Sequence, residues 1–345
     1  MTRAPTSARR TAQLRPRALR SSVTTGSYDR LDSCMIRACD YGDIRYFQMA
    51  RTMFGQAIYW TGVYVVDGLL VDSGPPNLAP EVRRLVGELG IRQCVTTHHH
   101  EDHAGNHALL SEQLHITPLV HSAGLARLAH PDPRPLLYRR LAWGVADAAP
   151  ATAVGQWLET PHFRFRVIHT PGHAPDHIVL YEPDHGWLFS GDLYLAPKLR
   201  YLRADEDVYA MIDSLRRAIA LEPRVVFCQH RGRVNDGAAR LQRKLEFLTE
   251  LGERIHELHR RGLGEAAIAR ALPGSDLLWR VWTGGDFSKR NFVRAFLRPP
   301  CPRDTAGSHG RSRRWRRGRE TGRGRGCRRR AARSAIHIPE APAQA

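Results

Sequence analysis

The sequence predicts an α/β fold, because short β-rich runs alternate with segments of helical periodicity and polar clusters follow the β-rich runs. Residues 64–66 and 69–71 are two such runs, and the Asp67-Gly68 dipeptide between them is typical of a tight β-hairpin turn. Residues 80–89 place four apolar side chains on one helical face, and Gly90 is suited to end that helix.

The remaining elements continue this alternation, with order expected to begin near residue 43. Further strands are expected at residues 44–47, 91–97, 117–120, 163–168, 178–181, 187–189 and 225–228. Helices are expected at residues 104–114, in a segment ending near 128, and at 208–221, 238–262, 264–272 and 287–297. Residues 131–155 are rich in Pro and Ala, and we interpret them as a flap or an irregular connection.

The positive charge of the chain is concentrated at its two ends. The formal net charge is +18, of which residues 1–30 contribute +6 and residues 298–345 contribute +11. The part between them is nearly neutral, so the total charge does not by itself indicate a nucleic-acid-binding domain. The N-terminal end is interpreted as a solvated extension, with a targeting or polyanion-binding arm as the alternative. The Arg-rich C-terminal end should bind polyanions in a salt-dependent manner.

These patterns divide the chain into four regions. They are a disordered basic extension at residues 1–30, an α/β domain at 43–235, a helical appendage at 238–297 and a disordered Arg-rich tail at 298–345. The appendage carries several Arg and Lys side chains. We interpret it as a packing or lid module, and a winged-helix-like DNA-binding unit is the alternative.

The composition disfavours several classes of protein. The six cysteines include no C-x-x-C pair, which argues against a disulfide framework or a zinc ribbon. No run of about 18 apolar residues is present, so no membrane span is expected. No apolar segment follows Arg9-Arg10, so export is not expected and a cytoplasmic location is the prediction. The Arg-, Ser- and Thr-rich N-terminus also resembles a transit peptide.

Residues 97–106, with the sequence THHHEDHAGN, hold the densest group of potential metal ligands. Imidazoles and carboxylates are costly to bring together unless a cation neutralises them, and a transition metal does this best. If His98 and His100 leave a strand end on the same side, they can share one metal. Asp102 and His103 would then face a second metal, whereas His99 would point away.

Other potential ligands also follow β-rich runs. They are His173 in the motif HTPGH, Asp192 in the motif SGD, and His230 after residues 225–228. Functional sites collect at the strand ends of layered α/β folds, so we expect these segments to converge. Asp72 ends the 69–71 run, and it is interpreted either as a turn residue or as an acceptor that orients a metal ligand.

The order of these motifs, THHHEDH, HTPGH, SGD and a late strand-end histidine, resembles that of the metallo-β-lactamase superfamily. The resemblance covers about residues 43–235. The downstream helical segment is similar to that of lactamase-beta-2-like hydrolases, and the glyoxalase II group shares the HTPGH-type motif. The resemblance implies a four-layer αββα sandwich with a C-terminal helical appendage, and it implies that the protein is an enzyme, a hydrolase.

The resemblance also implies two zinc ions per chain. The ligands implied for one ion are His98, His100 and His173, those for the other are Asp102, His103 and His230, and Asp192 is implied to bridge them. Imidazole and carboxylate ligands without a thiolate suit Zn²⁺ and also tolerate iron or manganese. His99 and Glu101 are expected outside this set. His169 is expected to be structural, and Cys228 to be a core thiol rather than a ligand.

The implied reaction is hydrolysis of a thioester, an ester or a lactone by a hydroxide activated between the two ions. Asp102 is expected to bind metal and to orient this hydroxide, and His177 is expected either to contact the substrate or an oxyanion or to support a metal ligand from behind. A small-molecule substrate is therefore the expected partner. The loop residues Lys198, Arg200, Tyr201 and Arg203 either bind an anionic group of the substrate or form a solvated basic loop.

Three other functions remain open from the sequence. A metal-dependent nuclease acting on RNA or DNA is suggested by the lactamase-beta-2 resemblance. A mononuclear iron persulfide dioxygenase would use a similar fold with fewer metal ligands. Non-enzymatic binding of nucleic acid or another polyanion would depend on the basic ends of the chain. The sequence does not define the oligomeric state.

Overall fold

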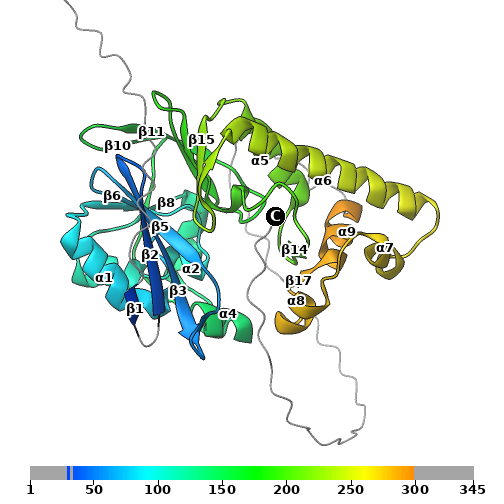
Figure 1. The fold of residues 1–345 in the computed structure, drawn as a ribbon, viewed down its shortest axis with the longest axis horizontal. Coiled ribbons are helices and arrows are strands. Elements are labelled where there is room, and N and C mark those ends of the chain that lie inside the picture. The colour runs from blue at the N-terminus through cyan, green and yellow to red at the C-terminus, as the bar shows by residue number, and fades with distance from the viewer. Residues whose placement is uncertain (1–28, 32–33, 299–345) are drawn as a thin grey trace, which may run out of the picture.

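Two mixed β-sheets face each other in the computed structural model, which describes residues 29–31 and 34–298 (Figure 1). Within these residues the first sheet has the order β1-β2-β3-β5-β6-β7-β8-β9, with β4 paired to β3. Its strands are β1 (Asp29–Leu31), β2 (Cys34–Asp40), β3 (Ile44–Met53), β4 (Gln56–Ala57), β5 (Thr61–Val66), β6 (Leu69–Val71), β7 (Gln93–Val95), β8 (Leu119–Val120) and β9 (Thr152–Ala153). The predicted extension at 1–30 and the Arg-rich tail lie almost entirely outside the described residues.

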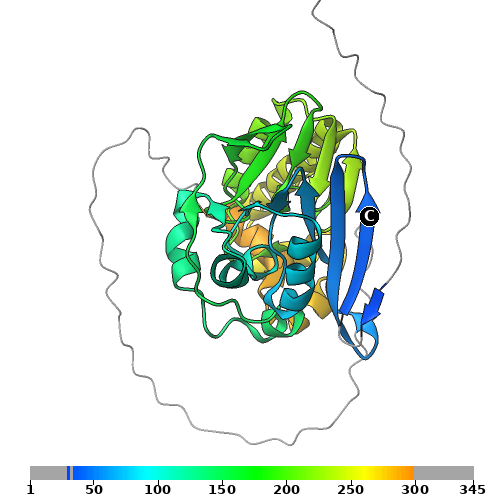
Figure 2. The same cartoon turned by 90° about the vertical axis from the view of Figure 1, so that its left-hand side faces the viewer.

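The second sheet has the order β10-β11-β12-β13-β15-β16. Its strands are β10 (Trp157–Glu159), β11 (Arg164–His169), β12 (Ile178–Glu182), β13 (Trp187–Phe189), β15 (Val225–Cys228) and β16 (Gly232–Asn235). A separate two-stranded ladder joins β14 (Leu202–Arg203) to β17 (Phe287–Ser288). A quarter turn of the molecule shows the blue strands of the first sheet at one side and the green strands of the second sheet above them (Figure 2).

Nine helices lie outside the two sheets in the described residues. They are α1 (Ala79–Glu88), α2 (Glu101–Ala104), α3 (Leu125–Ala129), α4 (Leu137–Ala142), α5 (Val208–Ile219), α6 (Gly237–Arg260), α7 (Glu265–Ala271), α8 (Leu277–Trp282) and α9 (Lys289–Leu297). Of these, α1 packs on the first sheet, and α5 and α6 pack on the second. Shorter turns lie at Pro76–Leu78, Leu109–Gln113, Ser122–Gly124 and Gly191–Leu193. No helix in the described ranges combines the length and the apolar character needed to cross a bilayer.

Three hydrophobic cores separate four layers, and strand β5 shows how the sequence produces them. Successive side chains of a strand point to opposite faces. Val63 and Val65 therefore pack in the core beneath α1, whereas Tyr64 and Val66 pack between the two sheets. A third core joins the second sheet to α5 and α6. The predicted αββα sandwich is confirmed.

The predicted hairpin between β5 and β6 is also confirmed. Val66 pairs with Leu69, and the two residues between them have positive φ values, +49° at Asp67 and +79° at Gly68. Two successive positive φ values belong to the tight turn that matches the twist of antiparallel strands, and Asp-Gly adopts this turn readily. The turn fixes the register of β6 and so the position of the residue that follows it, Asp72.

Some element boundaries differ from the predicted ones. The first sheet already includes β2, which lies before residue 43. Helix α2 begins at Glu101, inside the histidine cluster, rather than at residue 104. The cluster lacks the apolar periodicity from which a helix start is normally located. Residues 131–155 contain the short helix α4 and strand β9, and α8 forms where no helix was singled out.

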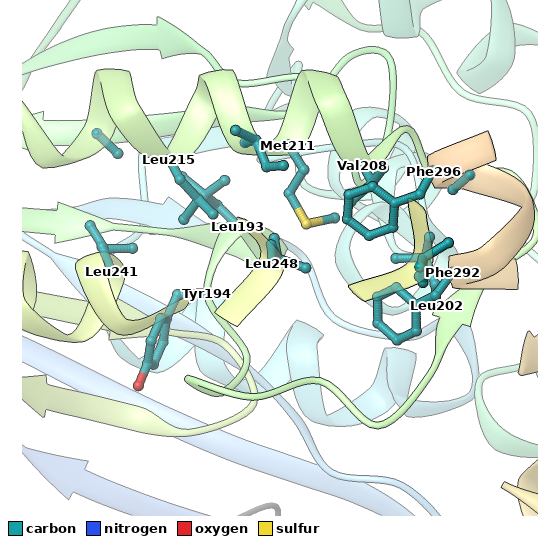
Figure 3. Close-up of a cluster of buried hydrophobic side chains, with 14 of the residues drawn as sticks. Leu193, Tyr194, Leu202, Val208, Met211, Leu215, Leu241, Leu248, Phe292 and Phe296 are labelled. Carbon is teal, nitrogen blue, oxygen red and sulfur yellow. The ribbon is translucent and has the colours of Figure 1, made fainter. Parts of the chain in front are cut away.

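The C-terminal helices share a core with the α/β domain. The long helix α6 runs beside α5, and α7, α8 and α9 gather at its far end (Figure 1). The shared core, shown in Figure 3, includes Leu193, Tyr194, Met211, Leu215, Leu241, Leu248, Phe292 and Phe296. Because β14 pairs with β17, these helices are also tied to the segment that follows Asp192. The helical segment is therefore continuous with the core that supports the strand ends.

Candidate metal centre

The seven predicted ligands meet at one edge of the sandwich. They come from four segments, in which His98 and His100 follow β7, Asp102 and His103 lie on α2, His173 follows β11, Asp192 follows β13, and His230 follows β15. Their side chains are all at most 9% exposed. The four segments lie far apart in sequence, and the fold brings their strand ends together.

The seven side chains form two groups of three, which His98, His103 and Asp192 join as a third group. His98, His100 and His173 place ligand atoms within 4.8 Å of one another, and so do Asp102, His103 and His230. Asp192 lies between them. One of its carboxylate oxygens is 3.2 Å from His173 Nε2, and the other is 3.1 Å from His230 Nε2. Asp192 therefore contacts both groups, as a bridging ligand would.

The buried donor atoms are arranged to bind a metal rather than to form hydrogen bonds with one another. Nε2 of His98, His103 and His230 and Oδ1 of Asp192 are buried without a hydrogen-bond partner, since their close approaches lack hydrogen-bond geometry. Buried polar atoms are normally paired, because leaving one unpaired costs about 1–3 kcal/mol. Divalent cations would satisfy all four atoms together. The donor set is imidazole and carboxylate, which suits zinc and also accepts iron or manganese.

Contacts on the far side of each ring set its orientation. His103 donates from Nδ1 to Asp72 at 2.8 Å, and His230 donates from Nδ1 to the Trp60 carbonyl at 2.8 Å. These bonds leave Nε2 of each ring as the atom that faces the cluster. Asp72 is fully buried and also accepts the Thr97 backbone N–H at 2.7 Å. The structure thus gives Asp72 an orienting contact in addition to its place at a strand end.

His177 lies behind the cluster rather than in the substrate space. It is fully buried and is not among the residues that line the cavity. Burial lowers its pKa to about 3, so the ring is neutral and its Nε2 can accept the Asp192 backbone N–H at 3.0 Å. A Cβ on Gly191, whose φ is +49°, would lie 2.5 Å from that nitrogen. Of the two predicted roles, the position of His177 favours support of the ligands over substrate contact: its ring holds the turn that carries Asp192.

Protonation in the cluster is set by burial and by the carboxylates. Burial, with the neighbouring histidines, holds the pKa of His98 well below its ordinary value. Burial also opposes protonation of His103, but the carboxylates around it, Asp102 first, hold its pKa well above the ordinary value. The carboxylates thus favour the protonated form of His103. Divalent ions would have to displace that proton, so metal affinity should fall as pH falls.

The residues excluded from the ligand set have other partners. His99 pairs with Asp176 at 2.6 Å, and Glu101 pairs with Arg139. His169 contacts the Pro175 carbonyl at 2.8 Å from within β11. Cys228 is fully buried in the core, and burial raises the pKa of its thiol to about 12, which leaves it protonated.

Sequence reasoning missed Glu206 and Lys244, which support the cluster, and it assigned Arg203 to substrate binding or to a solvated loop rather than to a contact with a ligand. Glu206 accepts the Nδ1–H of His173 at 2.5 Å. Arg203 is 4% exposed, and its guanidinium approaches His100 Nε2 at 2.5 Å while binding Asp205. Lys244 of α6 donates from Nζ to the Leu193 carbonyl at 2.7 Å. All three lie in runs of charged residues, and nothing local distinguishes them from solvated side chains.

Replacing Glu206 with alanine is expected to weaken metal binding by about 10- to 100-fold, because His173 loses the carboxylate that orients it. Titration with zinc in competition with a chromophoric chelator would measure this. The matched control is Glu182→Ala, which removes a buried carboxylate paired with His185 at the opposite end of β12. Equal affinity in the two variants would show that Glu206 does not position a ligand.

A cavity leads from the surface to the cluster. Its floor includes His100, Asp102, His173 and Asp192, and its walls come from both the α/β domain and the C-terminal segment. Of the four loop residues singled out in the sequence, Arg200, Tyr201 and Arg203 line this cavity, whereas Lys198 is exposed and does not. The cluster is therefore accessible to a small molecule.

The four-layer fold and the converging His/Asp cluster define a metal-site domain of the αββα type. Residues 63–230 match the family model described as the metallo-beta-lactamase superfamily. Residues 63–230 therefore form a domain of the metallo-β-lactamase type, as the motifs predicted. The relatives that the domain matches include hydroxyacylglutathione hydrolases and a beta-lactamase-like protein 2 homolog of Drosophila melanogaster, in agreement with the predicted lactamase-beta-2-like and glyoxalase II-like branch.

Curated relatives match part of the chain. The chain is 28% identical over 140 residues to a hydroxyacylglutathione hydrolase of Legionella pneumophila (strain Lens). This match covers 40% of the chain and 48% of that protein. It is also 28% identical over 206 residues to a thioesterase of Emericella nidulans, and this match covers 59% of the chain and 52% of that protein. The chain spans about half the length of these relatives. A beta-lactamase domain protein from Burkholderia ambifaria aligns over 81% of this chain and 90% of its own, with 16% identity and a TM-score of 0.52, and shares the fold.

Proposed function

We propose that this protein is a metal-dependent hydrolase of thioesters, esters or lactones that binds two divalent ions, zinc in preference to iron or manganese. The observation that carries the proposal is the position of Asp192. Its two oxygens contact histidines of both ligand groups, and unpartnered buried nitrogens surround it. The thioesterase name of the Emericella nidulans relative supports thioesters as the first class to test.

The chain's own residues have separable tasks in this proposal. When bound, two divalent ions lower the pKa of a coordinated water and polarise a carbonyl oxygen. Asp102 faces the cavity, with Oδ2 at 3.6 Å from Nε2 of both His103 and His230. Its carboxylate is therefore placed to orient the attacking water and to hold the proton that the water loses. Cys228 is excluded as a nucleophile because its thiol is buried and protonated.

A panel of substrates tests this function. Zinc-loaded protein is expected to hydrolyse thioesters, and Asp102→Ala is expected to lower kcat/KM by at least about 10³-fold, since both metal binding and water orientation depend on this carboxylate. Glu101→Gln is the matched control, because Glu101 lies on the same turn but pairs with Arg139 away from the cluster. Turnover that is unchanged in Asp102→Ala would refute the proposal.

The same panel separates the alternative functions. A nuclease would cleave RNA or DNA and leave thioesters and lactones intact. A persulfide dioxygenase would contain one iron per chain and consume oxygen. Polyanion binding through the ends of the chain would be lost when residues 1–28 and 299–345 are removed, whereas hydrolysis would remain. Metal analysis of the purified protein, with two ions per chain expected for the hydrolase, distinguishes the dioxygenase from the proposed hydrolase.

A further inference from the structure

We propose, on the basis of the hydrolase function above, that the site accepts a bulky, planar and apolar acyl group, such as an aromatic acyl thioester. The cavity beside the metal cluster carries the argument, because its wall is a nearly continuous series of aromatic rings. A small hydroxylated acyl group would leave most of this wall without contact.

The rings contact one another in sequence, starting at a metal ligand. The His230 ring lies 5.4 Å from Tyr59, and Tyr59 lies 5.4 Å from Trp143. The series continues from Trp143 to Tyr138 at 6.0 Å and from Tyr138 to Phe287 at 6.2 Å. These separations lie in the range in which aromatic pairs attract one another.

The same series closes the far side of the cavity. The Phe287 ring lies 5.6 Å from Tyr201, and Tyr201 lies 5.4 Å from Trp279 of α8. Trp282, one helical turn further on, also lines the cavity and packs against the group formed by Tyr138 and Trp143. The wall thus begins at Tyr59, whose ring contacts the metal ligand His230, and is completed by residues from the C-terminal segment.

Three polar side chains that line the cavity have partners already, whereas the indole Nε1 of Trp143 is buried without one. Tyr138 donates its hydroxyl to Asp286 at 2.6 Å, so it offers the cavity its ring. Glu206 is bound to His173. Arg203 is bound to Asp205 and approaches His100. An acyl group that contacts this wall would therefore meet ring surfaces more than hydrogen-bonding groups, and apolar planar groups gain most from such contacts.

Thioesters that share one leaving group test the proposal with zinc-loaded, full-length protein. We expect kcat/KM for 2-naphthoyl-N-acetylcysteamine to exceed that for acetyl-N-acetylcysteamine by at least about 10-fold. Trp279→Ala should lower the naphthoyl value by about 10- to 100-fold and the acetyl value by less than about 3-fold, because only the larger group reaches that ring. Trp279→Phe should retain most of the naphthoyl activity.

Two controls make the result decisive. Trp157→Ala removes a tryptophan that is 42% exposed and lies outside the cavity, and it should change neither substrate. Zinc content measured for each variant separates loss of the wall from loss of the site. Equal kcat/KM for the two thioesters, or equal losses in Trp279→Ala, would overturn the proposal and leave the hydrolase function standing.

A binding measurement separates failure of this inference from failure of the proposed function. If no thioester is hydrolysed, the hydrolase function fails, and binding of 2-naphthoate is compared with binding of acetate by calorimetry. Tighter binding of naphthoate that is weakened by Trp279→Ala supports the aromatic wall as a recognition surface. Binding that does not differ between the two acids overturns the inference.

Discussion

Replacing Asp192 with asparagine is expected to lower hydrolysis by at least about 10³-fold and to reduce bound metal from two ions per chain to one or none. The side chain contacts His173 on one side and His230 on the other, so it serves both halves of the cluster. Asparagine keeps the shape but loses the charge and one of the two anionic oxygens. A neutral amide cannot balance two divalent ions in a buried site.

Metal analysis and steady-state kinetics on the same preparation would measure the two effects. Asp176→Asn is the matched control, because Asp176 is also a buried carboxylate bound to a histidine, but that histidine is His99, outside the cluster. We expect the control to retain both metals. Full metal content with full activity in Asp192→Asn would exclude a bridging role and, with it, the two-ion arrangement.

Replacing Lys244 with methionine is expected to remove a pH-dependent part of the stability. Lys244 is fully buried, and burial lowers its pKa from 10.5 to about 8. Between these values the unfolded chain binds a proton that the folded chain does not, so the free energy of unfolding rises with pH across this window. The rise is about 1.4 kcal/mol per pH unit, or roughly 3 kcal/mol in total. Methionine fills a similar volume and carries no proton.

Urea unfolding of metal-depleted protein at pH 7.5 and pH 9.5 would measure this difference. The free energy of unfolding should rise between these values by roughly 2 kcal/mol more in the natural protein than in Lys244→Met. Tyrosines that ionise at high pH affect both proteins equally. Lys198→Met, at an exposed lysine, should follow the natural protein. An identical pH profile for Lys244→Met would show that the buried amine is not linked to folding.

Those parts of the molecule that depend on local sequence were predicted well. The Asp67-Gly68 turn and the apolar face of α1 are each determined by residues that are close together in sequence, so apolar periodicity and turn chemistry were sufficient to predict them. The motif residues at strand ends were also recognisable, and the fold brings them together because strand ends meet at one edge.

The residues that support the site could not be predicted in the same way. Glu206 reaches His173 from 33 residues further along the chain, and Lys244 reaches Leu193 across 51 residues. Trp279 approaches the cavity only because β17 pairs with β14. Each of these contacts depends on tertiary packing, and the local pattern around each residue is that of an ordinary charged or amphipathic segment.

The core shared by α5, α6 and α9 limits where this domain can be divided when segments are exchanged between proteins. A boundary drawn near residue 236 would separate Lys244 from the Asp192 turn and would strip Phe292 and Phe296 from the side chains they cover. The same truncation would remove Trp279 and Phe287 from the aromatic wall of the cavity. The C-terminal helices therefore cannot be exchanged independently of the α/β domain. Replacing them with those of another protein would alter metal affinity, folding and substrate choice together.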